Sequence, residues 1–181
     1  MVFFGLIGRK LRTASEPITD LNIQQAQLPG VDSEKLKGKV VMLVNTASEC
    51  GYRGQLNELT ALKKEFPSVE IIGMPTSDFL NQEKGTNEEV VECYMDEFDV
   101  DYILGDLIHV KGNDIHPFYA QLIASELGGA IEWNFSKWIF DTQGNLVARI
   151  KAATSPTHNV VKDFISTLAP STTVSEPAAE E

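Results

Sequence analysis

The sequence predicts an α/β protein in which a central mixed β-sheet is flanked by helices. Two continuous runs of β-branched and apolar residues, 39–47 and 69–74, are typical of strands buried on both faces. Apolar residues elsewhere recur at spacings of three and four, which indicates amphipathic helices that would cover such strands. The chain has 181 residues, about the size of one domain, so we expect a single core.

The composition excludes several classes of protein. Apolar residues make up 43% of the chain, and no apolar run approaches the roughly 18 residues of a membrane span, so we expect no stable membrane insertion. The formal charge of −11 would repel phosphate backbones, so nucleic acid is not an expected partner.

The metal-binding and redox residue types are few. Cys50 and Cys93 are the only cysteines, which excludes a disulfide-stapled scaffold and a four-cysteine zinc site, and favours a reducing compartment. His109, His116 and His158 are not spaced as ligands, so we expect no metal. The sequence has no phosphate loop or dinucleotide fingerprint, and we expect no cofactor.

Both ends of the chain differ in composition from the middle. Residues 1–15 are basic and free of acids, which predicts a flexible segment or a weak organelle presequence. The expected reducing compartment is the cytoplasm, and the basic N-terminal residues make a mitochondrion or plastid the alternative. Residues 170–181, "PSTTVSEPAAEE", predict a disordered acidic tail, which leaves 16–169 as the folded domain. Residues 13–38 suggest a lead-in segment with at most one short strand.

The elements follow one another in a readable order. After the first buried strand, Leu56, Leu59, Leu62 and Phe66 mark the apolar stripe of a helix that Pro67 closes. The second strand, 69–74, ends at Pro75, and residues 86–98 open with a Thr or Asn cap and two acids, as a helix does.

The remaining elements complete the predicted sandwich. Residues 137–150 predict two strands around the turn "DTQGN", and 155–168 a helix with a Ser155 cap and Pro156 at its first position. Its inward residues would be Val160, Val161, Phe164, Ile165 and Leu168. The order β-α-β, helix, β-β-α is that of a thioredoxin-like sandwich.

Cys50 lies where the first buried strand gives way to its helix. Unpaired N–H groups at a helix N-terminus stabilise an anion, which favours the reactive thiolate, although a lone cysteine can also be simple packing material. Position 53 is Arg53, which excludes a two-cysteine exchange motif. A single thiolate can still attack a peroxide and form a sulfenic acid, provided that hydrogen-bond donors surround the sulfur.

Several motifs together resemble the glutathione peroxidase family. They are "GKVVMLVNTASECG", "FLNQEKGTNEEV", "HPFY", "IEWNFSKWIFDTQGNLV" and the "SP" before the last helix. The likeness runs from about residue 38 to 168 and implies a catalytic group of Cys50, Gln82, Trp133 and Asn134. The amide and indole N–H groups of the last three are donors suited to an anionic sulfur.

The resemblance also implies partners and an oligomeric state. The short segment between "HPFY" and "IEWNF" implies a monomer of the type that reduces hydrogen peroxide and organic or lipid hydroperoxides. Thioredoxin is the preferred reductant and glutathione the alternative, for which Arg53 and Lys137 could supply charge to bind carboxylates. Arg53 could equally favour the thiolate or be a solvated surface group.

Cys93 falls on the second predicted helix, one or two positions before the place where thioredoxin-dependent members of the family carry a resolving cysteine. One residue turns a helix by about 100°, so Cys93 is either a resolving cysteine or inert packing. Where many members have "FPCNQF", this chain has "MPTSDF" at residues 74–79.

Three functions therefore follow from the sequence. The leading one is a thiol-dependent peroxidase acting through Cys50. The second is a peroxide sensor that passes oxidation from Cys50 to a partner protein. The third is an interaction domain in which the altered "MPTSDF" run marks a decayed site.

Overall fold

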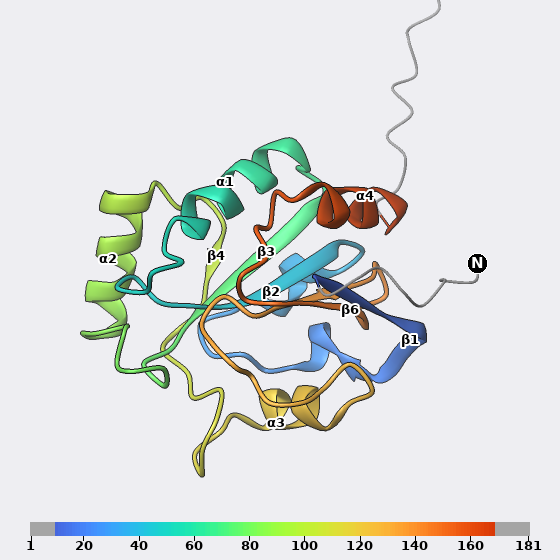
Figure 1. Ribbon diagram of the computed structural model, residues 1–181, viewed down its shortest axis with the longest axis horizontal. Coiled ribbons are helices and arrows are strands. Elements are labelled where there is room, and N and C mark those ends of the chain that lie inside the picture. The colour runs from blue at the N-terminus through green and yellow to red at the C-terminus, as the bar shows by residue number, and fades with distance from the viewer. Residues whose placement is uncertain (1–9, 169–181) are drawn as a thin grey trace, which may run out of the picture.

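Two parallel strands, β2 (Val40–Thr46) and β3 (Val69–Pro75), form the centre of the sheet and are buried along their whole length. The computed structural model describes residues 10–168 of the chain. In this range the sheet has six strands in the order β1-β6-β5-β2-β3-β4 (Figure 1). The other strands are β1 (Leu11–Asn22), β4 (Ile103–Leu104), β5 (Lys137–Phe140) and β6 (Asn145–Ile150).

The sheet is mixed, as the sequence predicts. β4 continues the parallel arrangement beside β3. On the other side of the centre, β5 runs antiparallel to β2, β6 to β5 and β1 to β6. Because successive side chains of a strand point to opposite faces, Val40, Met42 and Val44 join one core while Val41 and Leu43 join the other. The sheet therefore needs cover on both sides.

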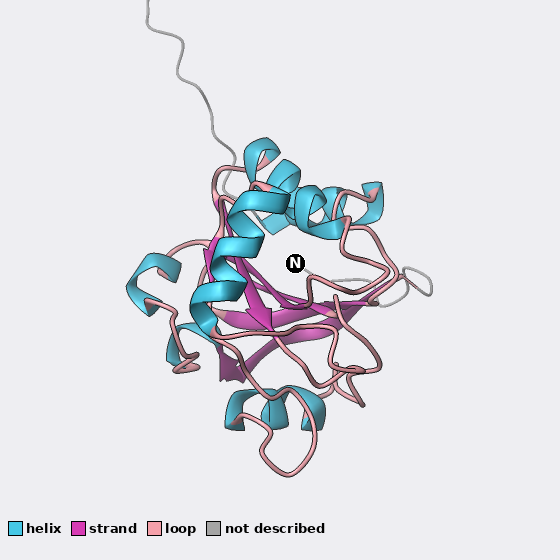
Figure 2. Cartoon of the chain, turned by 90° about the vertical axis from the view of Figure 1, so that its left-hand side faces the viewer, coloured by secondary structure: helices cyan, strands magenta, loops and turns pink. Residues whose placement is uncertain are grey.

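Helices supply that cover in two layers (Figure 2). α1 (Gln55–Glu65), α2 (Asn87–Phe98) and α4 (Asn159–Leu168) contribute to the first core, which also contains Cys50. α3 (Pro117–Ala124) and the short 3-10 helices η1 (Ile23–Gln25) and η2 (Ser33–Leu36) cover the opposite face. The predicted fold class, a mixed sheet flanked by helices, is confirmed.

The predicted elements at β2, α1, β3, α2, β5 and β6 are present. α2 begins as expected at an N-cap Thr86, whose hydroxyl accepts a hydrogen bond from the Glu89 backbone N–H while the Glu89 side chain returns one to the Thr86 N–H. The helix α3, which begins within "HPFY", was not predicted, because its eight residues are too few to show a clear period.

Two predicted boundaries are wrong. Residues 11–15 are not a flexible segment: they belong to β1, where Leu11 and Ala14 are buried and Leu11 pairs with Ile150. The last helix begins at Asn159 rather than at Ser155, because the Ser155 hydroxyl accepts from the Thr157 N–H and forms a turn ahead of the helix. The predictions for residues 1–9 and for the tail 170–181 lie outside the described residues.

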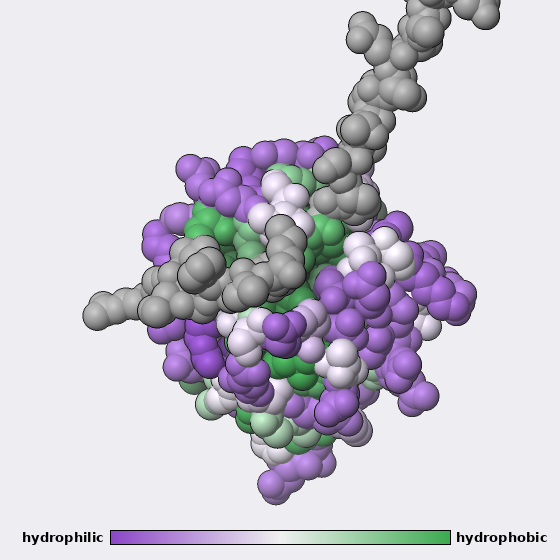
Figure 3. Space-filling view, turned by 90° about the vertical axis from the view of Figure 1, so that its right-hand side faces the viewer, coloured by the Kyte–Doolittle hydropathy of each residue, from purple (hydrophilic) through white to green (hydrophobic). Residues whose placement is uncertain are grey.

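The surface is mostly polar on the face shown in Figure 3, where hydrophilic side chains surround small apolar patches. Across residues 10–168 there is no helix with the length and apolar character needed to span a bilayer. The described chain therefore keeps its large apolar clusters between the sheet and its helices.

Candidate active site

Cys50 lies in a run of turns between β2 and α1. β2 ends at Thr46 and α1 begins only at Gln55, so the regular helix starts after the turn residues 51–54. Cys50 therefore lies between the strand and its helix, as expected, but outside the first turn of α1. The backbone N–H of Tyr52 donates to Cys50 Sγ at 3.4 Å, so a local turn amide, rather than the first turn of α1, faces the sulfur.

The thiol of Cys50 is almost enclosed. Only 1% of the residue is exposed, although residues 51–54 that follow it are exposed. The turn is closed by a hydrogen bond from the Arg53 N–H to the Cys50 carbonyl oxygen at 2.9 Å. The sulfur is thus shielded from solvent but lies directly beside an exposed turn.

Gln82 belongs to the loop after β3 and is attached directly to the Cys50 turn. Its carbonyl oxygen accepts a hydrogen bond from the Glu49 N–H at 2.9 Å. Its side-chain Oε1 accepts from Asn134 Nδ2 at 3.0 Å, which leaves the Gln82 amide N–H groups free of that contact and able to donate elsewhere. The structure therefore brings Gln82 and Asn134 together as a pair.

Trp133 and Asn134 precede β5 in a tightly held segment. Asn134 is fully buried, and Phe135 after it adopts a left-handed backbone with φ of 67°. The Phe135 N–H donates to the Asn45 carbonyl oxygen at 2.6 Å, so this segment is fastened to β2, the strand that leads to Cys50. Trp133 is half-buried and its ring lies 5.7 Å from that of Phe79, centroid to centroid.

The altered run at residues 74–79 holds this neighbourhood in place. Asp78 accepts hydrogen bonds from the Val110 and Lys111 N–H groups at 2.6 and 3.2 Å, and its other oxygen pairs with His109 Nδ1 at 2.7 Å. Burial works against ionisation of Asp78, but these donors outweigh it and hold the pKa of Asp78 below its ordinary value. The substituted run thus makes ordered contacts and places Phe79 against Trp133.

Lys137 does not have the role expected of it. Its side chain is fully buried, and Nζ donates to the carbonyl oxygens of Phe135 at 2.7 Å and Thr154 at 2.8 Å. Burial lowers the pKa of Lys137 to about 7, against the opposing charge of Glu58. A buried amine held by backbone carbonyls cannot bind the carboxylates of a reductant at the surface, so Lys137 is corrected from a substrate-binding to a structural residue.

Arg53, by contrast, is exposed on the turn beside Cys50 and is free to meet a ligand. Cys93 is half-buried on α2 and contacts the same core cluster as Cys50. Burial and the charge of Glu97 raise the pKa of the Cys93 thiol, while the Ser48 hydroxyl and Arg53 act in the opposite direction. Ser48 and Arg53, from the segment around Cys50, are therefore among the groups that act on the Cys93 thiol.

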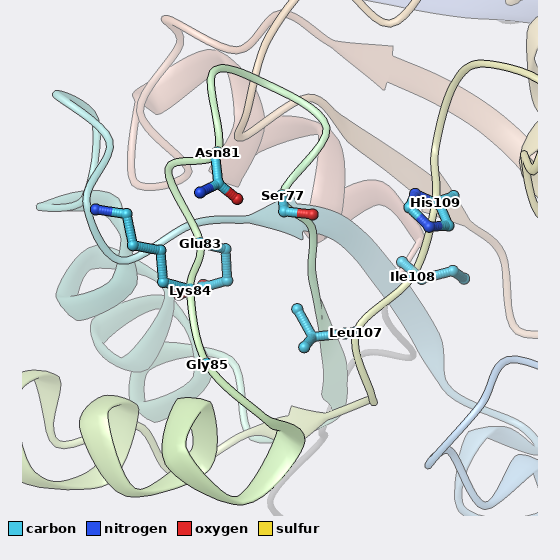
Figure 4. A pocket seen from close by; sticks show the side chains of 8 residues that line it. All are labelled: Ser77, Asn81, Glu83, Lys84, Gly85, Leu107, Ile108 and His109. Carbon is cyan, nitrogen blue, oxygen red and sulfur yellow. The ribbon is translucent and has the colours of Figure 1, made fainter.

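A cavity of about 340 Å³ lies behind the Gln82 loop (Figure 4). Asn81, Glu83 and Lys84 line one side of it and residues 107–109 the other. Cys50 is not among its lining residues, so the cavity is no direct approach to the thiol. Within residues 10–168, no group of three or more His, Cys, Asp or Glu side chains could hold a metal ion.

Sequence reasoning missed Glu83. This residue follows Gln82 directly, is 2% exposed, and accepts hydrogen bonds from the Ser48 hydroxyl at 2.7 Å and from the Tyr94 hydroxyl at 2.5 Å. Its position inside the "FLNQEKGTNEEV" motif was the available signal, but a Glu between polar loop residues is normally solvated.

The chain is similar to known proteins in both sequence and fold. The model of the family "Glutathione peroxidase" matches residues 18–123, a range that includes Cys50, Gln82 and Cys93 and ends before Trp133. An Arabidopsis thaliana protein, "Probable phospholipid hydroperoxide glutathione peroxidase 6, mitochondrial", is 36% identical over 154 residues, covering 81% of this chain and 66% of its own length. The "Glutathione peroxidase" of Lactococcus lactis is 36% identical over 132 residues, covering 70% of this chain and 83% of its own.

Solved structures agree with the fold. The apo crystal structure of Trgpx has a TM-score of 0.57 and 28% sequence identity, covering 87% of this chain and all of its own. T. cruzi GPX1 has a TM-score of 0.61 over 81% of this chain and 94% of its own, and its 24% identity supports the fold alone.

Proposed function

This chain belongs to the glutathione peroxidase family, and from this premise we propose that Cys50 is the residue that attacks the hydroperoxide. The Cys50 thiolate takes the terminal peroxide oxygen and becomes a sulfenic acid, while the O–O bond breaks and the other oxygen leaves, after protonation, as water or an alcohol. A reductant thiol then condenses with the sulfenic acid, releasing water, and a second thiol reduces the resulting disulfide.

One observation carries this proposal: three segments far apart in the sequence are fastened to one another at the Cys50 turn. The Asn134 amide donates to the Gln82 side chain at 3.0 Å, and the Gln82 backbone accepts from Glu49, the neighbour of Cys50. Because Asn134 occupies the Gln82 oxygen, the amide N–H groups of Gln82 are directed away from it and can serve as donors to the sulfur or the peroxide.

Trp133 and Asn134 are the further proposed members of the catalytic group. Trp133 is held by Phe79 and by its place ahead of the buried Asn134. An indole N–H is a donor without acceptor capacity, so it would stabilise an anionic sulfur without competing for its proton. Arg53 is proposed as a surface contact for an anionic substrate or reductant, since it is exposed beside the thiol.

Hydrogen peroxide and organic or lipid hydroperoxides are the proposed substrates, and thioredoxin is the preferred reductant over glutathione. Burial of Lys137 removes one of the two cations that could have bound the carboxylates of glutathione. The influence of Ser48 and Arg53 on the Cys93 thiol supports a resolving role, in which a Cys50–Cys93 disulfide is the form that thioredoxin reduces.

The protein is further proposed to be a monomer that works in a reducing compartment. The compartment is the cytoplasm or an organelle, and the names of two Arabidopsis thaliana relatives place those proteins in the mitochondrion.

The experiment treats the fully reduced protein with one equivalent of hydrogen peroxide and determines its mass and cysteine connectivity. We expect rapid oxidation at Cys50, with loss of two hydrogens and a Cys50–Cys93 bond. Oxygen added at Cys50 alone would keep the peroxidase assignment and make Cys93 structural.

Two variants provide the controls. Cys50→Ser is expected to consume no peroxide while keeping its circular dichroism spectrum, and retained consumption would refute the assignment. Cys93→Ser should still form the Cys50 sulfenic acid. Rapid oxidation of Cys50 that neither thioredoxin nor glutathione reverses would instead identify a sensor that hands its oxidation to a partner protein.

A further inference from the structure

Glu83 is a buried carboxylate at a junction of three segments. It accepts hydrogen bonds from the Ser48 N–H at 3.1 Å, the Ser48 hydroxyl at 2.7 Å and the Tyr94 hydroxyl at 2.5 Å. Ser48 precedes Cys50 by two positions in the same turn, whereas Tyr94 is on α2 and is fully buried. One side chain thus joins the Cys50 turn, the Gln82 loop and α2.

The loop that carries Gln82 has little regular structure of its own. Leu80 and Asn81 both adopt left-handed backbone conformations, with φ of 56° and 52°, and Leu80 is 78% exposed. Figure 4 shows this stretch passing along one wall of the cavity, with Asn81 and Glu83 on it. Within the loop the Gln82 N–H donates to the Phe79 carbonyl oxygen at 3.2 Å, and contacts to neighbouring segments add to this turn in fixing the position of Gln82.

Those contacts form a short ladder between the loop and the Cys50 turn. The Ser48 N–H donates to Glu83, and the next N–H, that of Glu49, donates to the Gln82 carbonyl at 2.9 Å. Outside the ladder, Lys84 and Glu49 form an ion pair at 2.6 Å, but both side chains are about half exposed and such a pair contributes little. The buried Glu83 carboxylate is the stronger attachment.

We propose that Glu83 is a positioning residue for the oxidation of Cys50: its carboxylate fixes the Gln82 backbone against the Cys50 turn, while Asn134 fixes the Gln82 side chain. This inference rests on the proposed function. Donors that act on a breaking O–O bond must be held within a fraction of an ångström, so loosening this junction would slow the peroxide reaction without removing any catalytic group.

The role of Glu83 depends on its hydrogen bonds to Ser48 and Tyr94 rather than on a negative charge. Burial raises the pKa of Glu83 despite the opposing hydrogen bonds from Ser48 and Tyr94, so the fold disfavours the ionised form. A glutamine could satisfy the same partners. Its Oε1 would accept from the Ser48 N–H and the Tyr94 hydroxyl, which now share one oxygen, and its Nε2 would donate to the Ser48 hydroxyl.

The test compares Glu83→Gln, Glu83→Asp and Glu83→Leu with the wild type. The reduced proteins are mixed with hydrogen peroxide, quenched by alkylation at set times, and the oxidised fraction of Cys50 is measured by mass spectrometry. We expect Glu83→Gln to react within about twofold of the wild-type rate and Glu83→Leu at least about tenfold more slowly. Glu83→Asp keeps the charge but is too short to reach both partners, so it should lie below Glu83→Gln.

The order of the Cys50 oxidation rates among the variants distinguishes a positioning role of Glu83 from an effect of its charge. Wild-type rates in Glu83→Leu, or an Asp variant faster than the Gln variant, would overturn the proposal. Circular dichroism, and the rate at which Cys50 is alkylated in the absence of peroxide, show whether a variant has lost structure generally. If Glu83→Leu fails to fold, the Asp and Gln pair still decides.

A second measurement separates this inference from the proposed function. Amide hydrogen exchange at Ser48 and Glu49 should be at least about tenfold faster in Glu83→Asp than in the wild type or Glu83→Gln, whether or not peroxide is consumed. Unchanged exchange would refute the attachment itself. Absence of Cys50 oxidation in the wild type would instead refute the proposed function.

Discussion

The side-chain amide of Asn134 donates a hydrogen bond to Oε1 of Gln82 at 3.0 Å, joining residues 52 positions apart in the sequence. This contact orients the Gln82 carboxamide. Its oxygen faces Asn134, and its N–H groups point away from Asn134. The Asn134 side chain is held in place because the residue is fully buried and is followed by a left-handed Phe135. The pair therefore acts as one unit beside the Cys50 turn.

Removing this unit should slow peroxide reduction. Asn134→Ala deletes the contact to Gln82 and one proposed donor, so we expect the rate of Cys50 oxidation to fall by about ten- to a hundredfold. Quenched-flow mass spectrometry measures that rate. Asn113→Ala, in an exposed loop, is the matched control and should react as the wild type does. A wild-type rate in Asn134→Ala would remove Asn134 from the catalytic group.

Lys137 should make stability rise with pH. Its pKa is about 7 in the folded protein and 10.5 ordinarily, so between these values the unfolded chain holds a proton that the folded chain has released. The contribution is present in full above the ordinary pKa and is lost as the pH falls through 7, with a slope of up to about 1.4 kcal/mol per pH unit. Urea unfolding at pH 7 and pH 9 should show this rise in the wild type and in the exposed control Lys151→Met, but not in Lys137→Met.

The His109–Asp78 pair should act with the opposite sign. The hydrogen bond to Asp78, followed by its charge, raises the pKa of His109 above its ordinary 6.5. The resulting stability is fully present below pH 6.5 and is lost as the pH rises through the raised value. We expect His109→Gln to lower the free energy of unfolding at pH 5.5 and to leave it almost unchanged at pH 8.5. An equal effect at both pH values would contradict the pairing.

The N-cap of α2 should make a measurable contribution to the free energy of unfolding. Thr86→Ala removes the hydroxyl that accepts from the Glu89 N–H, and we expect a loss of about 1 kcal/mol in the free energy of unfolding by urea. Thr86→Ser keeps the hydroxyl and should recover most of that loss. Equal losses in the two variants would show that the methyl group, rather than the cap, carries the effect.

Local patterns were sufficient for most of the fold. The apolar patterns were clear at β2 and β3, which are buried along their full length, and at α1, which is buried along one stripe. β1 was underestimated because its 12 residues alternate irregularly and carry shifts in their pairing with β6. The eight residues of α3 gave too short a signal.

The candidate site divides in the same way. The resemblance to the glutathione peroxidase family implied Cys50, Gln82, Trp133 and Asn134, because the motifs that carry it are short stretches of neighbouring residues. The failed expectation was Lys137, whose exposure depends on how the segments around residues 135, 152 and 154 close over it. Glu83 went unnoticed because its partners, Ser48 and Tyr94, lie 35 and 11 residues away.

By itself, the sequence determined the mixed α/β class, the family and the residue types available for thiol chemistry, because hydrophobic periods and motifs are written in neighbouring residues. Only the tertiary structure decided which groups meet and which are buried: the pairing of Gln82 with Asn134, the enclosure of Lys137 and the junction at Glu83. The reason is physical, since desolvation and hydrogen bonding depend on distances between segments that are remote in the chain.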